Sequence, residues 1–293
     1  MHKSVLLETV LSHLNLAPSQ IVLDATVGGG GHSEAILRRI SPKGFLIGLD
    51  QDPEALKRAR KRLEEVGGKF TLIHQNFRFL DQSLSSLNIH EVHAVLLDVG
   101  LSSDQLDEAG RGFSFMREGP LDMRMDPTQS QTAQDLIYGL SEKELTQVFG
   151  ELGEERYARR IANKIVTERP KRSIKTTFDL KYLVEEVVPS KYKFGRIHPA
   201  TRIFQALRIA LNDELNALKE ALPKAFAVLK PGGRLAVISF HSLEDRIVKQ
   251  YFVSLKNSGT GKIVTKKPIE ATEEEVAENP RSRSAKLRVI ERS

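Results

Sequence analysis

The first hundred residues alternate between short apolar runs and segments with helical periodicity. Uninterrupted apolar runs of this length are typical of parallel strands that are buried on both faces of a sheet. An amphipathic helix is predicted at Val5–Leu16, and strands follow it at residues 21–24, 45–50, 70–74 and 94–99. Strands that alternate with helices in this way predict a doubly wound α/β domain with a parallel sheet.

The periodicity changes after the fourth predicted strand. Gly100–Asp126 has neither a strand period nor a helix period, and it is too long for a tight βα connection, so we expect a functional loop there. From residue 132 to residue 222 the patterns are helical, without strand alternation. Helices are expected at residues 133–138, 142–149, 154–167, 177–188 and 200–222.

The α/β pattern resumes with a predicted strand at Leu235–Phe240 and a helix at Glu244–Leu255, and a final antiparallel pair of strands is expected near the C-terminus. The simplest arrangement is an all-helical domain inserted between the fourth and fifth strands. We therefore predict an α/β domain built from residues 1–108 and 216–293, interrupted by a helical domain at residues 109–215.

A run of four glycines, Gly28–Gly31, separates the first predicted strand from the helical pattern around Ile36. Glycine has no side chain, so a ligand can approach the main chain closely at this turn. The first turn of the following helix also presents N–H groups that have no partner within the helix. Strand, glycine turn and helix in this order form the first unit of a nucleotide-binding α/β fold.

Acidic residues end three of the predicted strands, namely Asp24, Asp50 and Asp98. In a doubly wound sheet these strand ends meet at the point where the strand order reverses. Carboxylates there would repel a pyrophosphate, but they suit a ligand with a cationic centre, an ammonium group and ribose hydroxyls, which describes S-adenosylmethionine (SAM). Asp50 lies 19 residues after Gly31, the usual position of an acid that accepts the ribose hydroxyls.

The composition narrows the chemistry, because the 293 residues include no cysteine. This excludes disulfides, thiolate metal sites, radical SAM clusters and the cysteine nucleophile that methylation at C5 of a pyrimidine generally requires. Attack by an amine or hydroxyl on a methyl group remains, and it needs no metal. No apolar run approaches the ~20 residues that cross a bilayer. Since a signal-peptide pattern is also missing, we expect a cytoplasmic protein with no membrane partner.

The positive charge is concentrated in one segment. The whole chain carries a net charge of +6, whereas residues 156–208 contain fourteen Lys or Arg and four Asp or Glu, a net charge of +10, which leaves −4 for the remainder. A basic segment in an otherwise near-neutral protein is the expected footprint of a polyanionic partner. A solvated helical surface is the alternative explanation of the same charges.

Six stretches together resemble one protein family. They are VGGGGHS at residues 27–33, LDVGLSSDQLD at 97–107, RGFSF at 111–115, GPLDMRM at 119–125, HPATR at 198–202 and SFHSLEDR at 239–246. These motifs resemble the RsmH (MraW) family of bacterial SAM-dependent methyltransferases. That family modifies the N4 amine of a cytidine in the decoding region (P site) of 16S rRNA, in the small ribosomal subunit. The resemblance extends from near Val5 to the C-terminus.

The resemblance implies a class I methyltransferase domain with a helical domain inserted after the fourth strand. It also implies which residues contact SAM: Gly30, Gly31, His32, Asp50, Phe77, Asp98 and Gln105.

The acid after the fourth strand is the candidate catalytic residue. Cytosine N4 is a weak nucleophile because its lone pair is delocalised into the ring, so acceptors for its hydrogens assist attack. Many amino-methyltransferases place Asp/Asn-Pro-Pro-aromatic at this point, where Asp98–Leu101 supplies the acid without the prolines or the aromatic ring. We hypothesise that Asp98 lies where cofactor and target amine meet, and that Phe113 or Phe115 stacks on the base.

Substrate contacts are predicted from charge and position. His241 follows the fifth strand and faces the same sheet edge, while His198 and Arg202 open a helix in the basic segment, where an anion can bind. A hydrogen-bonded structural role is the alternative for His241. We predict that the helical insert clamps RNA through Arg156, Arg159, Arg160, Lys164, Arg169, Lys171, Arg172 and Lys175.

Three other functions compete with this interpretation. A nicotinamide-dependent oxidoreductase is disfavoured by the acidic strand ends and because Ser33 or Glu34 stands where its fingerprint needs a third glycine. A SAM-binding RNA chaperone or assembly factor would bind both ligands without methyl transfer. A methyltransferase that acts on DNA or on a small molecule is the closest rival, since the basic segment disfavours a small molecule but does not distinguish RNA from DNA.

Overall fold

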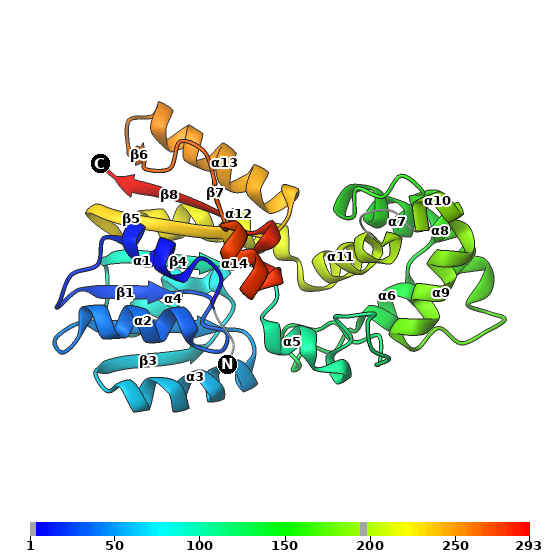
Figure 1. The fold of residues 1–293 in the computed structure, drawn as a ribbon, viewed down its shortest axis with the longest axis horizontal. Coiled ribbons are helices and arrows are strands. Elements are labelled where there is room, and N and C mark those ends of the chain that lie inside the picture. Colours follow the sequence, from blue (N-terminus) through cyan, green and yellow to red (C-terminus); the bar gives the residue numbers. More distant parts are fainter. Residues whose placement is uncertain (1–3, 194–197) are drawn as a thin grey trace. The chain divides into compact units, whose positions relative to one another are not determined.

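The chain forms two compact units, Met1–Gly100 with Leu215–Ser293, and Leu101–Glu214 (Figure 1). The structure, a computed structural model, describes residues 4–193 and 198–293. The second unit begins at Leu101 rather than at the expected residue 109, because Leu101 and Leu106 pack against the hydrophobic core of the helical unit.

The first unit is built on a mixed sheet with the strand order β3-β2-β1-β4-β5-β8-β6, and β7 pairs with β8. β1 to β5 are parallel to their neighbours, whereas β8 runs antiparallel to β5, β6 and β7. The strands are β1 (Ile21–Asp24), β2 (Phe45–Asp50), β3 (Lys69–His74), β4 (Val92–Asp98), β5 (Leu229–Ser239), β6 (Gly261–Ile263), β7 (Ile269–Glu270) and β8 (Lys286–Arg292). The strand order reverses between β1 and β4, which makes the carboxyl ends of these two strands the switch point of the sheet.

Helices cover both faces of this sheet (Figure 1). Alternate residues of β4 are buried on opposite faces of the sheet. Ala94 and Leu96 belong to the core under one helical layer, and Val95 and Leu97 belong to the core under the other. The first layer contains α1 (Leu7–Leu14), α2 (Gly31–Ile40) and α3 (Pro53–Val66). The second layer contains α4 (Leu80–Ser86), α12 (Glu214–Ala227) and α13 (Ser242–Asn257). A short helix, α14 (Glu273–Glu278), precedes β8.

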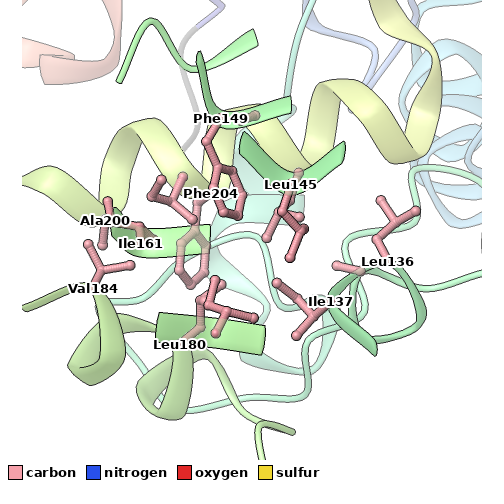
Figure 2. Packing of buried hydrophobic residues seen from close by; sticks show 14 of the residues in the cluster. Leu136, Ile137, Leu145, Phe149, Ile161, Leu180, Val184, Ala200 and Phe204 are labelled. Carbon is pink, nitrogen blue, oxygen red and sulfur yellow. The ribbon is translucent and has the colours of Figure 1, made fainter. Parts of the chain in front are cut away.

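The second unit is helical and has a hydrophobic core of its own. Figure 2 shows Phe149, Ile161, Leu180 and Phe204 packed together at its centre. Its helices are α5 (Ser103–Asp107), α6 (Ala133–Gly139), α7 (Glu142–Gln147), α8 (Ala158–Glu168), α9 (Thr177–Val187), α10 (Ser190–Lys193) and α11 (Pro199–Asn212). No helix formed by residues 4–193 and 198–293 combines the length and the apolar character that a membrane crossing requires.

One predicted helix is wrong, because residues 200–222 form two helices instead of one. α11 ends at Asn212, and Asp213 takes the left-handed conformation with φ 51°, which Asp tolerates better than most residues. The buried Asn212 amide accepts a hydrogen bond from Met125 N (2.8 Å) and donates one to Met123 O (2.9 Å). The amphipathic pattern continues across a break of one residue, so periodicity alone does not reveal it.

Candidate active site

The glycine turn joins β1 to α2 and is shaped by close packing against α3. Gly30 has φ 82°, and a Cβ atom there would lie only 3.0 Å from the Cα of Ala59. A side chain at this position would therefore meet both backbone strain and a steric clash. Gly28 N donates to Asp50 Oδ2 at 2.7 Å, which links the turn to the end of β2.

Asp50 holds the turn with both of its carboxylate oxygens. Oδ2 accepts from Gly28 N, and Oδ1 accepts from Asp52 N at 2.8 Å. Burial raises the pKa of Asp50 to about 6, and the neighbouring Asp52 adds to this, whereas the two N–H donors and Arg58 oppose it. Each carboxylate oxygen accepts more than one hydrogen bond, so Asp50 retains capacity for hydroxyl donors.

Asp24 is completely buried at the end of β1 and has a structural role. Its carboxylate accepts from Ser33 Oγ (2.6 Å) and from Thr26 N (3.2 Å), which ties the strand to α2. Burial raises the pKa of Asp24 to about 6, and the charge of Asp50 contributes to the same shift. Of the three acids predicted at the strand ends, Asp24 has no exposed oxygen that a ligand could contact. It acts on the site only through its negative charge.

Asp98 ends β4 and carries the least satisfied carboxylate of the three. Its backbone N–H donates to Thr26 Oγ1 at 2.6 Å, and its side chain is 22% exposed. Oδ1 is buried and has no hydrogen-bond partner within residues 4–193 and 198–293. Burial, followed by the charges of Asp24 and Glu244, holds the pKa of Asp98 well above its usual range. An oxygen in this state suits a cation or an N–H donor, which is the fit expected for SAM and a target amine.

His32 lies beside Asp98 in the first turn of α2 and is 6% exposed. Its Nδ1 atom is 3.5 Å from Asp98 Oδ2, and its Nε2 atom is 3.0 Å from the Val5 carbonyl oxygen. Phe77 follows β3 in a short 3₁₀ helix and packs, half-buried, at the edge of the core that contains α4. The predicted cofactor residues Gly30, Gly31, His32, Asp50, Phe77 and Asp98 all belong to the first unit.

The sequence interpretation missed Glu244, which is 2% exposed at the start of α13. Its Oε2 accepts from Phe240 N (2.8 Å) and from His241 N (3.3 Å), and its own N–H donates to His241 Nδ1 (3.4 Å). This reciprocal arrangement is a capping box, and a polar residue followed three positions later by Glu was the available signal. His241 is therefore the N-cap of α13. Its predicted contact with the base or with RNA stays a prediction.

Gln105, Phe113 and Phe115 lie in the second unit. Gln105 closes a capping box on α5, in which its Oε1 accepts from Ser102 N at 3.1 Å. Phe113 is buried in the core of the helical unit, and Phe115 packs at the margin of that core. The Phe115 ring lies 5.1 Å from the rings of both His198 and Phe204.

His198 and Arg202 are placed at the start of α11, as predicted, but both make contacts within the protein. His198 Nδ1 accepts from Ala200 N (3.2 Å), so Nε2 carries the proton that faces Glu185 Oε1 at 3.1 Å. Arg202 donates from Nη1 to the carbonyl oxygen of Glu154 at 2.8 Å. Any contact of these two side chains with RNA stays a prediction.

Two exposed arginines rest on aromatic rings at the N-terminal end of α8. The guanidinium of Arg156 lies 4.1 Å from the Tyr192 ring centroid and 5.0 Å from that of Tyr157, and Arg160 lies 5.7 Å from Tyr157. Tyr192 is held in turn by a hydrogen bond of 2.7 Å to the buried Glu155. Within the described residues, neither arginine has a carboxylate at ion-pair distance, so both guanidinium groups are available to an anion.

Three other basic residues of the predicted clamp make contacts within the helical unit, and two of them are paired with acids. Lys164 lies 3.0 Å from Glu186 and 3.3 Å from Glu168, and Arg172 contacts the same two acids. Arg169 donates to the carbonyl oxygens of two residues at the end of α6, Ile137 (2.8 Å) and Leu140 (2.7 Å). The structure therefore separates the basic segment into available and internally paired side chains.

Three features define a class I methyltransferase fold: a mixed sheet whose parallel strands reverse their order between β1 and β4, a glycine turn at the first β–α junction, and an acid at the ends of β1, β2 and β4. An all-helical unit is inserted after β4. The chain belongs to the MraW methylase family, whose family model matches residues 1–293.

Relatives of the chain are similar over almost their whole length. A protein of Syntrophotalea carbinolica named ribosomal RNA small subunit methyltransferase H is 49% identical over 306 aligned positions, which cover 99% of this chain and 98% of the relative. A protein of Heliobacterium mobile with the same name is 48% identical over 307 aligned positions, which cover 99% of this chain and 98% of that relative. The crystal structure of an rRNA methylase from Streptococcus thermophilus has a TM-score of 0.47 at 13% identity, covering 100% of this chain and 98% of that one, a likeness too distant to bear on the site.

Proposed function

We propose that this protein is a SAM-dependent methyltransferase of small-subunit rRNA that methylates N4 of a cytidine in the decoding region of 16S rRNA. Membership of the MraW methylase family supports methyl transfer, and the shared name of the curated relatives supports rRNA of the small subunit as the substrate. The N4 position and the decoding region rest on the resemblance of the motifs at residues 97–107 and 239–246.

The observation that carries this proposal is that Asp98 Oδ1 is buried and has no hydrogen-bond partner in the described part of the chain. When bound, SAM supplies a methyl group on a positively charged sulfur. In our proposal the glycine turn, Asp50 and Phe77 hold the adenosine part, and Asp98 Oδ1 accepts a hydrogen from the target amine. An acceptor at that hydrogen draws the nitrogen toward tetrahedral geometry and frees its lone pair, and alignment with the methyl group supplies most of the remaining acceleration.

The arginines on the aromatic rings are the proposed RNA contacts. Tyr157 and Tyr192 restrict the guanidinium groups of Arg156 and Arg160, so less conformational entropy is lost when each binds a phosphate in its planar fork. Since a duplex would hide the N4 amine, the target cytidine must be unpaired or flipped out when it reacts.

The test is incubation of the purified protein with methyl-labelled SAM and small ribosomal subunits from cells that lack the enzyme. The modified nucleoside is then located by mass mapping of nuclease fragments. The expected result is one labelled N4-methylcytidine in the decoding region. Label on another atom or another nucleotide would overturn the specificity, and binding of both ligands without transfer would identify a chaperone or assembly factor instead.

A further inference from the structure

The absence of a side chain at Gly100 makes room for an aromatic ring from the end of β5. Gly100 lies two residues after Asp98 and has φ 110°, and a Cβ atom there would lie 3.3 Å from Cδ2 of Phe240 and 3.9 Å from Cε2. One edge of the Phe240 ring therefore occupies the space beside the main chain that a side chain at Gly100 would need.

The pairing of β4 with β5 places this ring on the same face of the sheet as the Asp98 carboxylate. Asp98 pairs with Ile238, and the N–H of the next residue donates to the Ile238 carbonyl oxygen at 3.1 Å. Side chains alternate between the two faces along a strand. Leu96 and Ile238 belong to one core, so Asp98 and Phe240, each two positions further on, lie on the face of that core, and Phe240 packs against it.

The main chain of Phe240 is fixed, and its ring is half-buried. Its N–H donates to Glu244 Oε2 at 2.8 Å, and Glu244 is itself buried at the start of α13. The charge of Glu244 is one of the causes that raise the pKa of Asp98, so this carboxylate lies close to both residues. The core supports one part of the ring, and the accessible part is left for a ligand.

We propose that Phe240 is a substrate-binding residue whose ring supplies the flat surface on which the target cytosine stacks. The inference rests on the proposed function, since it takes an unpaired cytosine as the substrate. The sequence Asp/Asn-Pro-Pro-aromatic carries a ring three residues after the acid, where this chain has Leu101. Leu101 offers no ring and packs against the core of the helical unit. A ring at the end of β5 replaces the one that is missing after β4.

Stacking would orient the amine as well as hold the base. The N4 amine lies in the plane of the cytosine ring, so a surface that fixes this plane also limits the directions in which the amine can point. Every base has a π-face, so an aromatic ring can hold a base that has left its own stack. Hydrogen bonding to Asp98, on the same face of the sheet, then selects among the orientations that stacking allows.

Phe113 and Phe115 are the competing rings for this role. Phe113 is buried in the core of the helical unit, and Phe115 contacts the rings of His198 and Phe204 there. Of these three phenylalanines, Phe240 is the one that shares a face of the sheet with Asp98.

The first test is steady-state methylation of small ribosomal subunits by Phe240→Leu, which keeps an apolar side chain for the core but has no flat ring. We expect kcat/KM for the RNA to fall roughly tenfold to a hundredfold, the range that loss of a stacked ring gives, with the KM for SAM unchanged. Phe240→Tyr retains the ring and should stay within about threefold of wild type. Phe45→Leu is the control, because Phe45 is also half-buried but begins β2, at the opposite end of the strands, and it should leave kcat/KM unchanged.

Three kinetic results would overturn the proposal. The first is a wild-type kcat/KM in Phe240→Leu. The second is a rise in the KM for SAM that accounts for the whole loss, since the ring would then support the cofactor site. The third is a loss confined to Phe115→Leu, which would assign the stacking surface to the helical unit.

The second test reports on stacking directly. The chain contains no tryptophan, so Phe240→Trp introduces a single indole whose fluorescence depends on its own surroundings. The probe is an RNA fragment of the decoding region with either the target cytidine or an abasic nucleotide at the target position. It is added with S-adenosylhomocysteine at concentrations at which filter binding detects the complex. We expect the cytidine fragment to quench the indole and the abasic fragment to leave it bright, whereas Phe45→Trp should respond to neither. Equal fluorescence of Phe240→Trp with both fragments would overturn the proposal.

The two possible failures are distinguishable. A wild-type protein that methylates N4 of the cytidine, together with an equally active Phe240→Leu variant, overturns this inference alone. A wild-type protein that transfers no methyl group to RNA overturns the proposed function together with the inference.

Discussion

The Ser33 hydroxyl donates a hydrogen bond of 2.6 Å to Asp24 Oδ2 and thereby fastens the first turn of α2 to the end of β1. Because Asp24 is completely buried, Ser33→Ala leaves its carboxylate with one donor fewer and no water to replace it. We expect a loss of about 1–3 kcal/mol in the free energy of unfolding. Urea denaturation measures this loss. Ser254→Ala is the control, since Ser254 Oγ donates an exposed hydrogen bond to the Tyr251 carbonyl oxygen of its own helix, and it should change stability by less than about 0.5 kcal/mol.

The raised pKa of Asp24 predicts a pH dependence of stability. The folded protein binds this proton more tightly than the unfolded chain, whose Asp24 has a pKa near 3.8 against about 6 when folded. The contribution of Asp24 is therefore fully present below pH 4 and is lost as the pH rises to about 6. Relative to wild type, Asp24→Asn should gain up to about 3 kcal/mol across that interval. Urea titrations at intervals of half a pH unit measure the difference, and a constant difference would contradict the buried, raised carboxyl.

Substitution of the unpaired basic side chains of the helical unit should weaken RNA binding more than substitution of the basic side chains that are paired with acids. Arg156→Gln with Arg160→Gln removes two guanidinium groups that have no acidic partner among the residues that the structure describes. RNA binding should therefore weaken, and the slope of log K against log salt should fall by roughly 1.5. Lys164→Gln with Arg172→Gln is the matched control, because Glu168 and Glu186 neutralise both of those side chains. Filter binding to small-subunit RNA at several salt concentrations measures both, and equal losses in the two double variants would contradict the assignment.

Substitutions of Asp98 and Asp50 should affect different kinetic constants, kcat for Asp98 and the KM for SAM for Asp50. Asp98→Asn removes the proposed acceptor of the amine hydrogen and should lower kcat by about 100-fold or more. Asp50→Asn weakens the carboxylate that holds Gly28 and is proposed to accept the ribose hydroxyls, so its main effect should be a higher KM for SAM. Steady-state methylation assays with small ribosomal subunits give both constants. An Asp98→Asn enzyme with wild-type kcat and normal SAM affinity would remove Asp98 from the reaction.

Local sequence was sufficient for the framework of the first unit. The strands at residues 21–24 and 45–50 were predicted with the bounds that the structure has, since buried parallel strands read as unbroken apolar runs. The placement of Asp24, Asp50 and Asp98 at strand ends follows from the same pattern. The break at Asp213 was missed because it costs one residue of helix and depends on contacts of Asn212 with Met123 and Met125, almost ninety positions away.

The linear order of residues by itself determined the fold class, the helical insert, the acidic strand ends and the basic character of residues 156–208, because each is a local or compositional property. Only the tertiary structure decided which of these groups are available for chemistry. Ser33 donates to Asp24, whereas Asp98 Oδ1 has no hydrogen-bond partner among the described residues. Glu186 pairs with Lys164, whereas Arg156 lies over the ring of Tyr192. Hydrogen bonding and charge pairing act between side chains that are distant in sequence, and the pattern along one chain does not encode those distances.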